Sequence, residues 1–343
     1  MRPNATQGDM AGIMLFYNTN DLPMQSSEPD LSIIIVFYKT SHLIEPLMAA
    51  LDASTSHLSV ETIIVDNASC DGSVARLRER VPSARIIENE RNVGFGRANN
   101  QALAVAHGRF LLLLNTDAFV APETLLATVR AMEEHPDWGI LGVRLVGPDG
   151  SDQPSCRHFP TPANIFLNAT GLGRVMPWVK PVDDPLCKRD VTQECDWVPG
   201  CYFLIRRSVV EQIGVLDSRF FMYYEEVDYC RRAKAAGWKV VYFPGTRVIH
   251  LGGVSAERLG PLAATIRQVP ALQLESEILY FRKHLGLPGL LTIFMLTLAA
   301  NAIVRFKAAV RQKQPRPEYT GLPSSFALII TLLQTRCGLR PTR

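Results

Sequence analysis

The sequence predicts an α/β fold, a doubly wound and mostly parallel sheet followed by a C-terminal helical tail that associates with membranes. Three observations lead to this prediction. Short apolar runs alternate with helix-length segments over residues 31–135. The composition, 47% hydrophobic and 20% charged, is that of a globular chain that can bury a sizeable core. Residues 285–304 carry no charge, and Lys and Arg residues follow them.

Four apolar runs are predicted to be strands, at residues 31–38, 60–66, 84–88 and 110–115. Because almost every position in them is apolar, both faces of the sheet should be covered, as in a parallel sheet. The segments between them have apolar residues at helical spacing or a helix start signal, and they are 41–54, 72–80, 94–107 and 122–135. Ligands of such sheets bind beyond the carboxyl ends of the strands.

The alternation stops near residue 146, and prolines mark an irregular stretch over 147–196. Regular structure is predicted to resume with a strand at 197–205, a short helix near Ser208, an aromatic and acidic segment at 220–228, a helix to Gly237, and strands around 240–242 and 248. The predicted organisation is a poorly ordered extension (1–30), one α/β domain (31–284) and an apolar and basic helical tail (285–343).

The net charge of +3 is distributed unevenly. Residues 301–343 hold eight Lys and Arg against Glu318 alone, which leaves residues 1–300 slightly acidic. The slightly acidic charge of residues 1–300 argues against nucleic acid as a partner.

Seven cysteines without a C-x-x-C pair predict a reducing compartment. Cys187, Cys195 and Cys201 match no usual zinc spacing, so we expect no structural zinc.

Polar residues follow the second and third predicted strands. Asp66 and Asn67 end the second strand, and Asp71 opens the turn after it. A carboxylate there can accept the N3 hydrogen of a uracil or thymine ring, although turns and helix caps also favour Asp and Asn.

After the third strand, glycines allow a close backbone approach to a phosphate at a helix N-terminus. The candidates in that segment are Asn92, Gly94, Phe95, Asn99 and Asn100, of which Asn99 and Asn100 could equally be helix-face amides.

The fourth strand ends in Asn115 and Asp117, which places a hard oxygen ligand where Mg²⁺ or Mn²⁺ would hold a diphosphate. Read alone, this is a capped turn. With Asp66 and Gly94 it completes three polar strand ends on one edge of one sheet. His250 could be a further metal ligand, although a lone histidine is more often structural.

Three carboxylates, Glu225, Glu226 and Asp228, lie beside four aromatic residues in 220–228. When carboxylates cluster in a partly desolvated site, their mutual repulsion raises the pKa of one of them, which suits a general base. The alternative is a charged first turn of the following helix, stabilised by the helix dipole.

Together these motifs resemble an inverting family-2 glycosyltransferase with the GT-A fold, most similar to its rhamnosyltransferase-like branch. The resemblance covers residues 31–284 and adds the segment Trp197–Gly200 to the motifs above. It implies transfer of a sugar, with rhamnose as one candidate, from a nucleoside-diphosphate donor to a hydroxyl of a lipid-linked or polysaccharide acceptor. It also implies Mg²⁺ or Mn²⁺ as cofactor. Two alternatives stay open, a nucleotidyltransferase and a catalytically silent polysaccharide-assembly partner.

The resemblance also implies individual roles. Asp66 would bind the nucleotide base, Asp117 and His250 the metal, and Glu226 would be the general base, with Glu225 or Asp228 as substitutes. Asn115 stands where other glycosyltransferases have an Asp. Trp197 and Gly200 are expected on the acceptor side. A homo-oligomer is left open.

The tail is expected to bind the cytoplasmic face of the inner membrane, as a peripheral or monotopic anchor. Only residues 290–300 are strongly apolar, fewer than the roughly 20 that a spanning helix needs. The cations that follow, Arg305 to Arg316, and a second apolar segment at 326–333 suit an anchor at an anionic surface. The alternative is a buried helix packed on the α/β domain.

Overall fold

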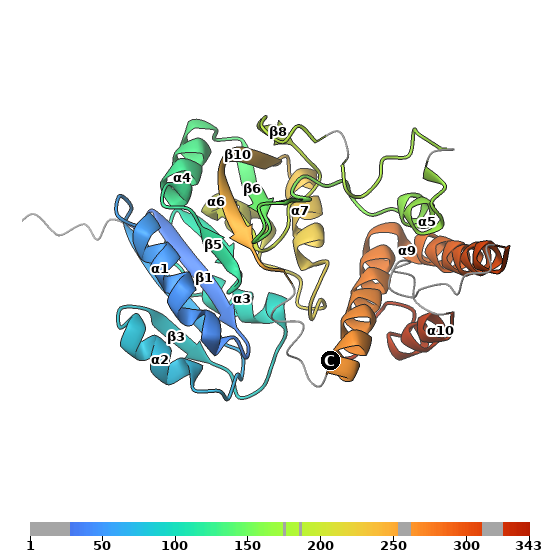
Figure 1. Cartoon of the computed structure of the whole chain (residues 1–343), viewed down its shortest axis with the longest axis horizontal. Coiled ribbons are helices and arrows are strands. Elements are labelled where there is room, and N and C mark those ends of the chain that lie inside the picture. The colour runs from blue at the N-terminus through green and yellow to red at the C-terminus, as the bar shows by residue number, and fades with distance from the viewer. Residues whose placement is uncertain (1–27, 174–175, 185–186, 253–261, 311–324) are drawn as a thin grey trace, which may run out of the picture.

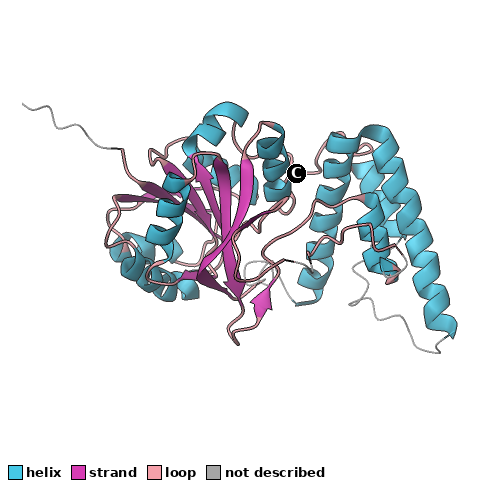
Figure 2. Cartoon of the chain, turned by 90° about the horizontal axis from the view of Figure 1, so that it is seen from above, coloured by secondary structure: helices cyan, strands magenta, loops and turns pink. Residues whose placement is uncertain are grey.

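The computed structural model describes residues 28–173, 176–184, 187–252, 262–310 and 325–343. Most of the expected N-terminal extension therefore lies outside the described residues. The described chain forms an α/β part around one sheet and a C-terminal helical part beside it (Figure 1). Seen from above, the C-terminal helices stand along one side of the sheet-containing part (Figure 2).

The first half of the sheet is parallel, as the sequence predicts. Its strands lie in the order β3-β2-β1-β4, and they are β1 (Leu31–Phe37), β2 (Val60–Asp66), β3 (Arg85–Glu88) and β4 (Phe110–Leu114). The connections are the 3₁₀ turn η1 (Ser41–Leu43), α1 (Ile44–Ser54), α2 (Ser73–Arg80) and α3 (Phe95–Leu103). Alternate side chains of one strand enter two different cores, because successive residues point to opposite faces. Ile34 belongs to one core and Ile33 and Ile35 to the other.

The second half of the sheet is mixed. β9 (Tyr202–Arg206) lies antiparallel between β4 and β6 (Trp138–Val146), and β10 (Lys239–His250) runs parallel to β6. β5 (Ala118–Val120) pairs antiparallel with the end of β10, and the helix α4 (Thr124–Glu134) precedes β6. Two short strands, β7 (Asp152–Gln153) and β8 (Gln193–Glu194), pair with β6 and β10. Antiparallel strand additions of this kind are common on otherwise parallel sheets.

Several strands differ from the expectation. β6 was not predicted, since Gly139 and Gly142 interrupt its apolar run; a Cβ at Gly142 would lie 2.6 Å from Val198. The strands expected around 240–242 and 248 are one strand, β10, whose register shifts between Phe243 and Arg247. The segment expected as a strand from residue 197 becomes one only at Tyr202.

The remaining helices are α5 (Pro162–Thr170), α6 (Arg207–Ile213), α7 (Glu225–Ala235), α9 (Leu262–Val310) and α10 (Ser325–Gln334). α9 is broken at Gly286, whose φ of 67° is left-handed. Residues 271–307 form the one described helix long and apolar enough to cross a membrane by length and composition. The expected domain boundary after residue 284 falls inside α9, two residues before this break.

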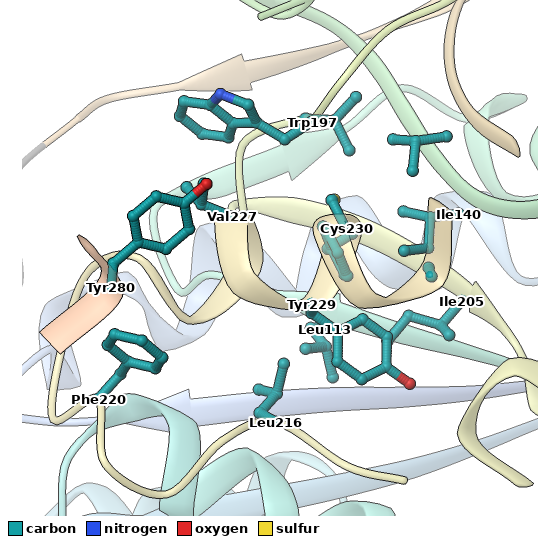
Figure 3. Packing of buried hydrophobic residues seen from close by; sticks show 14 of the residues in the cluster. Leu113, Ile140, Trp197, Ile205, Leu216, Phe220, Val227, Tyr229, Cys230 and Tyr280 are labelled. Carbon is teal, nitrogen blue, oxygen red and sulfur yellow. The ribbon is translucent and has the colours of Figure 1, made fainter. Parts of the chain in front are cut away.

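The part of α9 before the break docks on the α/β part. Tyr280 belongs to the same buried cluster as Phe220 and Val227 (Figure 3). Beside it, Asp228 of α7 is fully buried and accepts hydrogen bonds from Lys283 (2.5 Å) and His284 (2.7 Å). Although burial by itself would raise the pKa of Asp228, the hydrogen bonds from His284 and Lys283 hold it below its usual range. The carboxylate is therefore charged and paired, and it joins α7 to α9.

We expect Asp228→Asn to destabilise the chain by about 3 kcal/mol or more, because it removes the buried charge that accepts hydrogen bonds from Lys283, His284 and Arg232. Of these three, only Lys283 keeps a second described carboxylate, Asp217, as a partner. Thermal unfolding of the full-length protein measures this loss. Asp137→Asn, which breaks the exposed pair with Lys239, is the matched control and should leave the melting temperature unchanged. Equal melting temperatures for the two variants would contradict the docking role of Asp228.

Candidate functional site

A cavity of about 270 Å³ lies at the carboxyl ends of β1 and β4 and is called the main cavity below. Its walls bring together nine of the residues that the sequence predicted: Asn67, Asn92, Phe95, Asn115, Asp117, Gly200, Glu225, Glu226 and His250. Sequence reasoning missed seven others: Val36, Tyr38, Thr116, Pro199, Cys201, Met222 and Tyr223. Five of the seven lie within or directly beside a segment that the sequence singled out for the site, so position within a motif was the available signal; Val36 and Tyr38 do not.

Asp117 and His250 meet because β5 pairs antiparallel with the end of β10, which sets Ala118 opposite His250. The His250 Nε2 lies 3.8 Å from the Asp117 Oδ1. This distance is too long for a hydrogen bond. Two ligands of one octahedral ion with metal–ligand bonds near 2.1 Å stand about 3.0 Å apart when adjacent and about 4.2 Å apart when opposite, and the observed separation falls between the two.

The hydrogen bonds of Gln153 determine the tautomer of His250. The Gln153 amide nitrogen donates to the His250 carbonyl oxygen (2.8 Å), so the amide oxygen faces the ring Nδ1 at 2.8 Å. Nδ1 must then carry the proton, and Nε2 presents its lone pair to the main cavity, as in a metal-binding histidine with an outer partner. Burial also lowers the pKa of His250, which keeps the ring neutral. Gln153 lies in the irregular stretch, where no sequence signal marks it.

Unpartnered oxygens gather on the main cavity. Seven buried side-chain N or O atoms in the described chain lack a hydrogen-bond partner, and four of them belong to residues that line this cavity: Asn115, Thr116, Glu225 and Glu226. A buried polar atom without a partner costs about 1–3 kcal/mol. Such a cluster fits a polar ligand that supplies the missing partners.

The polar side chains of the main cavity fit a hard divalent cation that takes only some of its ligands from the protein. The described residues include no group of three or more His, Cys, Asp or Glu side chains arranged to hold a metal ion. Asp117 and His250 are two groups that could hold such an ion, and Asn115 lines the same cavity. Mg²⁺ and similar ions are commonly bound through one or two protein ligands together with substrate phosphates and water.

The acidic pair begins α7 on a strained backbone. Tyr223 and Tyr224, which precede Glu225, have φ values of 71° and 68°, in the left-handed region. Such residues cost about 1–3 kcal/mol each and persist only where surrounding contacts hold them. Ser276 of α9 provides one such contact, because its hydroxyl donates to the Met222 carbonyl oxygen (2.8 Å).

Burial raises the pKa values of both members of the pair. The shift is larger for Glu225, which is 5% exposed and also feels the charge of Glu226. For Glu226, the nearby charge of Arg157 partly offsets the effect of burial. The pair therefore holds a proton to higher pH than free glutamate, and Glu226 is the member whose ionised form is better stabilised.

Asp66 and Asp71 lie next to the main cavity in a smaller one of about 260 Å³, the edge cavity, between β2 and α2. One Asp66 oxygen accepts from the Ser69 backbone N–H (3.2 Å), and the other is buried without a partner. Asp71 accepts hydrogen bonds from Ser73 at the start of α2. The structure thus separates the residue expected to bind a base from those expected to bind a metal.

Four predicted amides form hydrogen bonds within the protein. Asn67 donates to Asn92 (2.8 Å) and accepts from the Val93 N–H (3.0 Å), so it fixes the loop before α3. Asn99 donates to the Phe95 carbonyl oxygen (2.9 Å), and Asn100 pairs with the backbone of Leu216. Asn99 and Asn100 are absent from the lining of the cavities described above and act as helix-face amides.

Two other predicted residues lie away from the main cavity. Trp197 is 7% exposed, its indole N–H donates to the His158 carbonyl oxygen (2.9 Å), and the Arg157 guanidinium lies over its ring. Its aromatic face is therefore covered by protein, contrary to the expected contact with a sugar. Asp228 is also outside this cavity, because its carboxylate is used in pairing with α9.

The cysteines considered for zinc separate in the fold. Cys187 and Cys195 lie beside Cys156, whereas Cys201 is buried near Asp117. Burial raises the pKa of Cys187 to about 12, which keeps this thiol protonated.

The chain is similar in sequence to known glycosyltransferases. Residues 32–214, more than half of the chain, match the family model described as Glycosyl transferase family 2. The N-acetylglucosaminyl-diphospho-decaprenol L-rhamnosyltransferase of Mycobacterium tuberculosis is 29% identical over 245 residues, which cover 64% of this chain and 75% of that protein. The rhamnosyltransferase WbbL of Escherichia coli is 26% identical over 167 residues, 46% of this chain and 60% of that protein.

Among solved structures, a mannosyltransferase of Pyrobaculum calidifontis in complex with GDP-Man and Mn²⁺ has a similar fold. The superposition has a TM-score of 0.54 at 17% identity and covers 91% of this chain and 88% of that one. At this identity the likeness concerns the fold alone.

We expect Glu225→Gln to stabilise the chain increasingly above the ordinary glutamate pKa of 4.5. The raised pKa in the folded state means that wild type loses stability as pH rises from that value, and Gln does not titrate. Thermal unfolding at pH 4, 6 and 8, without metal or nucleotide, measures the difference. Glu90→Gln, at an exposed position, is the control and should show no such trend. A constant difference across pH would contradict the raised pKa.

Proposed function

The chain belongs to glycosyl transferase family 2, and we propose that it is a metal-dependent, inverting member that transfers a sugar from a nucleoside-diphosphate donor to an acceptor hydroxyl. It is a rhamnosyltransferase-like glycosyltransferase with the GT-A fold. The observation that carries the proposal is the main cavity, where Asp117 and His250 line the same space as Glu225 and Glu226. Its unpartnered oxygens suit a ligand with a charged and a hydroxylated end.

The donor would bind across the carboxyl edge of the sheet. Asp66 in the edge cavity would accept a hydrogen bond from the base, since one of its buried oxygens lacks a partner. Asn92 and Phe95, at the start of α3, line the main cavity next to it. The edge cavity would therefore hold the base of the nucleotide sugar, and the main cavity beside it would hold the rest of the donor.

Asp117 and His250 would hold Mg²⁺ or Mn²⁺ together with the donor diphosphate. When bound, the cation would supply positive charge that offsets the negative charge developing on the leaving nucleoside diphosphate. Gln153 would keep the His250 ring oriented with its Nε2 lone pair toward this place. The neighbouring Asn115 oxygen adds a neutral polar group on the same wall.

Glu226 would take the proton of the acceptor hydroxyl as the acceptor oxygen attacks the anomeric carbon, so the configuration inverts in one displacement. A base must be ionised, and Arg157 favours the ionised form of Glu226. Glu225, more deeply affected by burial, would keep its proton and position the start of α7. A base of this kind contributes roughly 10²- to 10⁴-fold to the rate.

The acceptor would be lipid-linked or a polysaccharide, and rhamnose is one candidate for the transferred sugar. The names of the two bacterial relatives support the sugar, and that of the mycobacterial protein supports a diphosphate-linked lipid acceptor. These assignments are carried from relatives under 30% identical to this chain.

Membrane association through the C-terminal helices would bring the enzyme to such an acceptor, at the cytoplasmic face. After the break at Gly286, α9 exposes apolar side chains at helical spacing, including Leu291 (54% exposed), Met295 (61%) and Phe306 (70%). α10 exposes Phe326 and Leu333. Arg305 adds a cation next to this surface, whereas Arg311, Lys313 and Arg316 lie outside the described residues. An apolar helix face with flanking cations suits an anionic leaflet.

We expect Glu226→Gln to lower turnover by about 10²-fold or more with unchanged donor affinity, as for a lost general base. Steady-state transfer from a nucleotide sugar, with donor binding measured by calorimetry, tests this. Glu225→Gln is the matched control and should lose less. If Glu225→Gln is the more damaging change, Glu225 is the base; if neither variant loses activity, the acidic pair has no catalytic role.

Asp117→Ala should abolish Mn²⁺-dependent transfer while the chain remains folded, because this strand-end carboxylate contacts the cavity rather than a hydrophobic core. The readouts are transfer with titrated Mn²⁺ and circular dichroism. Asp137→Ala, on the exposed surface, controls for the loss of a carboxylate. Undiminished wild-type activity in excess EDTA would contradict metal dependence.

The triple variant Leu291→Gln, Met295→Gln, Phe306→Gln should shift full-length protein from anionic vesicles to the supernatant, since each exposed apolar side chain contributes to membrane binding by burial. Co-sedimentation at low salt measures the shift. Val191→Gln with Val215→Gln, which alters exposed apolar residues of the α/β part, is the control. Equal sedimentation of the triple variant and wild type would rule out this surface as the anchor.

A further inference from the structure

A third cavity, of about 470 Å³, lies outside the residues assigned so far and is called the helix-side cavity. Its walls come from the irregular stretch, the start of α5 and the middle of α7. The side chains that matter below are His158, Phe159, Lys180, Asp196 and Arg231. None of the residues that line it also lines the main cavity.

Two of these side chains bring positive charge that no described carboxylate neutralises. Arg231 donates to the Tyr280 hydroxyl (3.0 Å) and stacks over Phe159, and both contacts are with uncharged groups. Lys180 is exposed and forms no ion pair with another described residue. A cavity with two such cations on its wall suits a ligand that carries more than one negative charge.

The acidic residue of this wall is already paired. Asp196 accepts the Phe159 backbone N–H (3.0 Å) and lies within 3.6 Å of the His158 ring and 3.9 Å of the Lys234 ammonium group. His158 also faces Asp184 at 3.5 Å. Lys234 itself forms a closer ion pair with Glu194 (2.6 Å), so Asp196 offsets part of the positive charge of this wall, and Lys180 and Arg231 are its two cations without an ion pair to a described carboxylate.

The helix-side cavity and the proposed base share one helix but lie on different sides of it. Arg231 follows Glu226 by five residues on α7, which corresponds to about 7.5 Å along the helix axis and about 140° around it. A ligand that contacts both residues therefore has to pass around α7.

The same cavity borders an apolar route toward the C-terminal helices. Val179 is part of its wall, and the neighbouring Trp178 is 73% exposed. α5, whose first turn lines the cavity, packs on α9, and Lys307 donates to the Thr170 carbonyl oxygen at the end of α5. A lipid chain attached to a group in this cavity would meet these apolar surfaces.

We propose that the helix-side cavity binds the diphosphate group of a prenyl-diphosphate-linked sugar acceptor, with Lys180 and Arg231 as its cationic contacts. This inference rests on the proposed function and adds to it the place where the acceptor is recognised. The acceptor sugar would then extend around α7 toward Glu226, and the prenyl chain would leave past Trp178.

The test uses full-length enzyme and two synthetic acceptors with the same sugar, farnesyl-diphosphate-linked N-acetylglucosamine and octyl N-acetylglucosaminide. Lys180→Glu should raise the KM for the diphosphate acceptor about tenfold or more, the effect of losing one contact to a charged group. The KM for the octyl glycoside and the KM for the donor should not change. Lys188→Glu, an exposed position of the same stretch outside the cavity, is the matched control and should affect neither acceptor.

An equal KM increase for both acceptors, or no increase for either, would overturn the proposal. Calorimetric binding of both probes without donor separates this failure from that of the proposed function. If wild type transfers no sugar yet binds the diphosphate probe in a Lys180-dependent manner, the cavity assignment stands and the proposed function falls. Lys180-dependent binding of inorganic pyrophosphate with the same affinity as the prenyl probe would assign the cavity to a free diphosphate and overturn the lipid-linked acceptor.

Discussion

The close approach of Gly94 to Phe221 is the contact on which the site depends. The Phe95 N–H donates to the Phe221 carbonyl oxygen (2.7 Å), and a Cβ at Gly94 would lie 2.5 Å from that same oxygen. Gly94 also has a φ of 91°, which side-chain-bearing residues rarely adopt. This contact joins the loop before α3 to the segment before α7. It therefore sets the acidic pair above the strand ends that carry Asp117.

The site is held in an unfavourable state by the rest of the fold. Left-handed tyrosines before α7 and buried oxygens without partners both cost free energy, and such costs concentrate at functional sites. The compensation comes from α9, through Ser276 below the strained turn and through the pairing of Asp228 with Lys283 and His284. The helix that carries the proposed membrane surface thus also supports the catalytic segment.

α7 connects the two cavities that the proposals use. Its first turn presents Glu225 and Glu226 to the main cavity, and its middle presents Arg231 to the helix-side cavity. Tyr280 of α9 contacts Arg231, so the helix pair that holds the proposed base also holds this arginine. A substrate that reaches both cavities would be held at two sides of one rigid helix, which favours precise positioning of the attacking oxygen.

Local sequence determined the parallel half of the sheet and the chemistry at its edge. Short apolar runs bounded by turn signals predict strands covered on both faces, and Asn115 and Asp117 directly follow such a run, so their place at the sheet edge needs no distant partner. Glu226 opens a helix, but its place above this edge depends on the contact of Gly94 with Phe221. The tertiary structure decided what depends on residues far apart in the chain. Gln153 orients His250, Arg157 covers Trp197, and α9 takes Asp228 away from the site, because each of these contacts joins segments that sequence periodicity cannot relate.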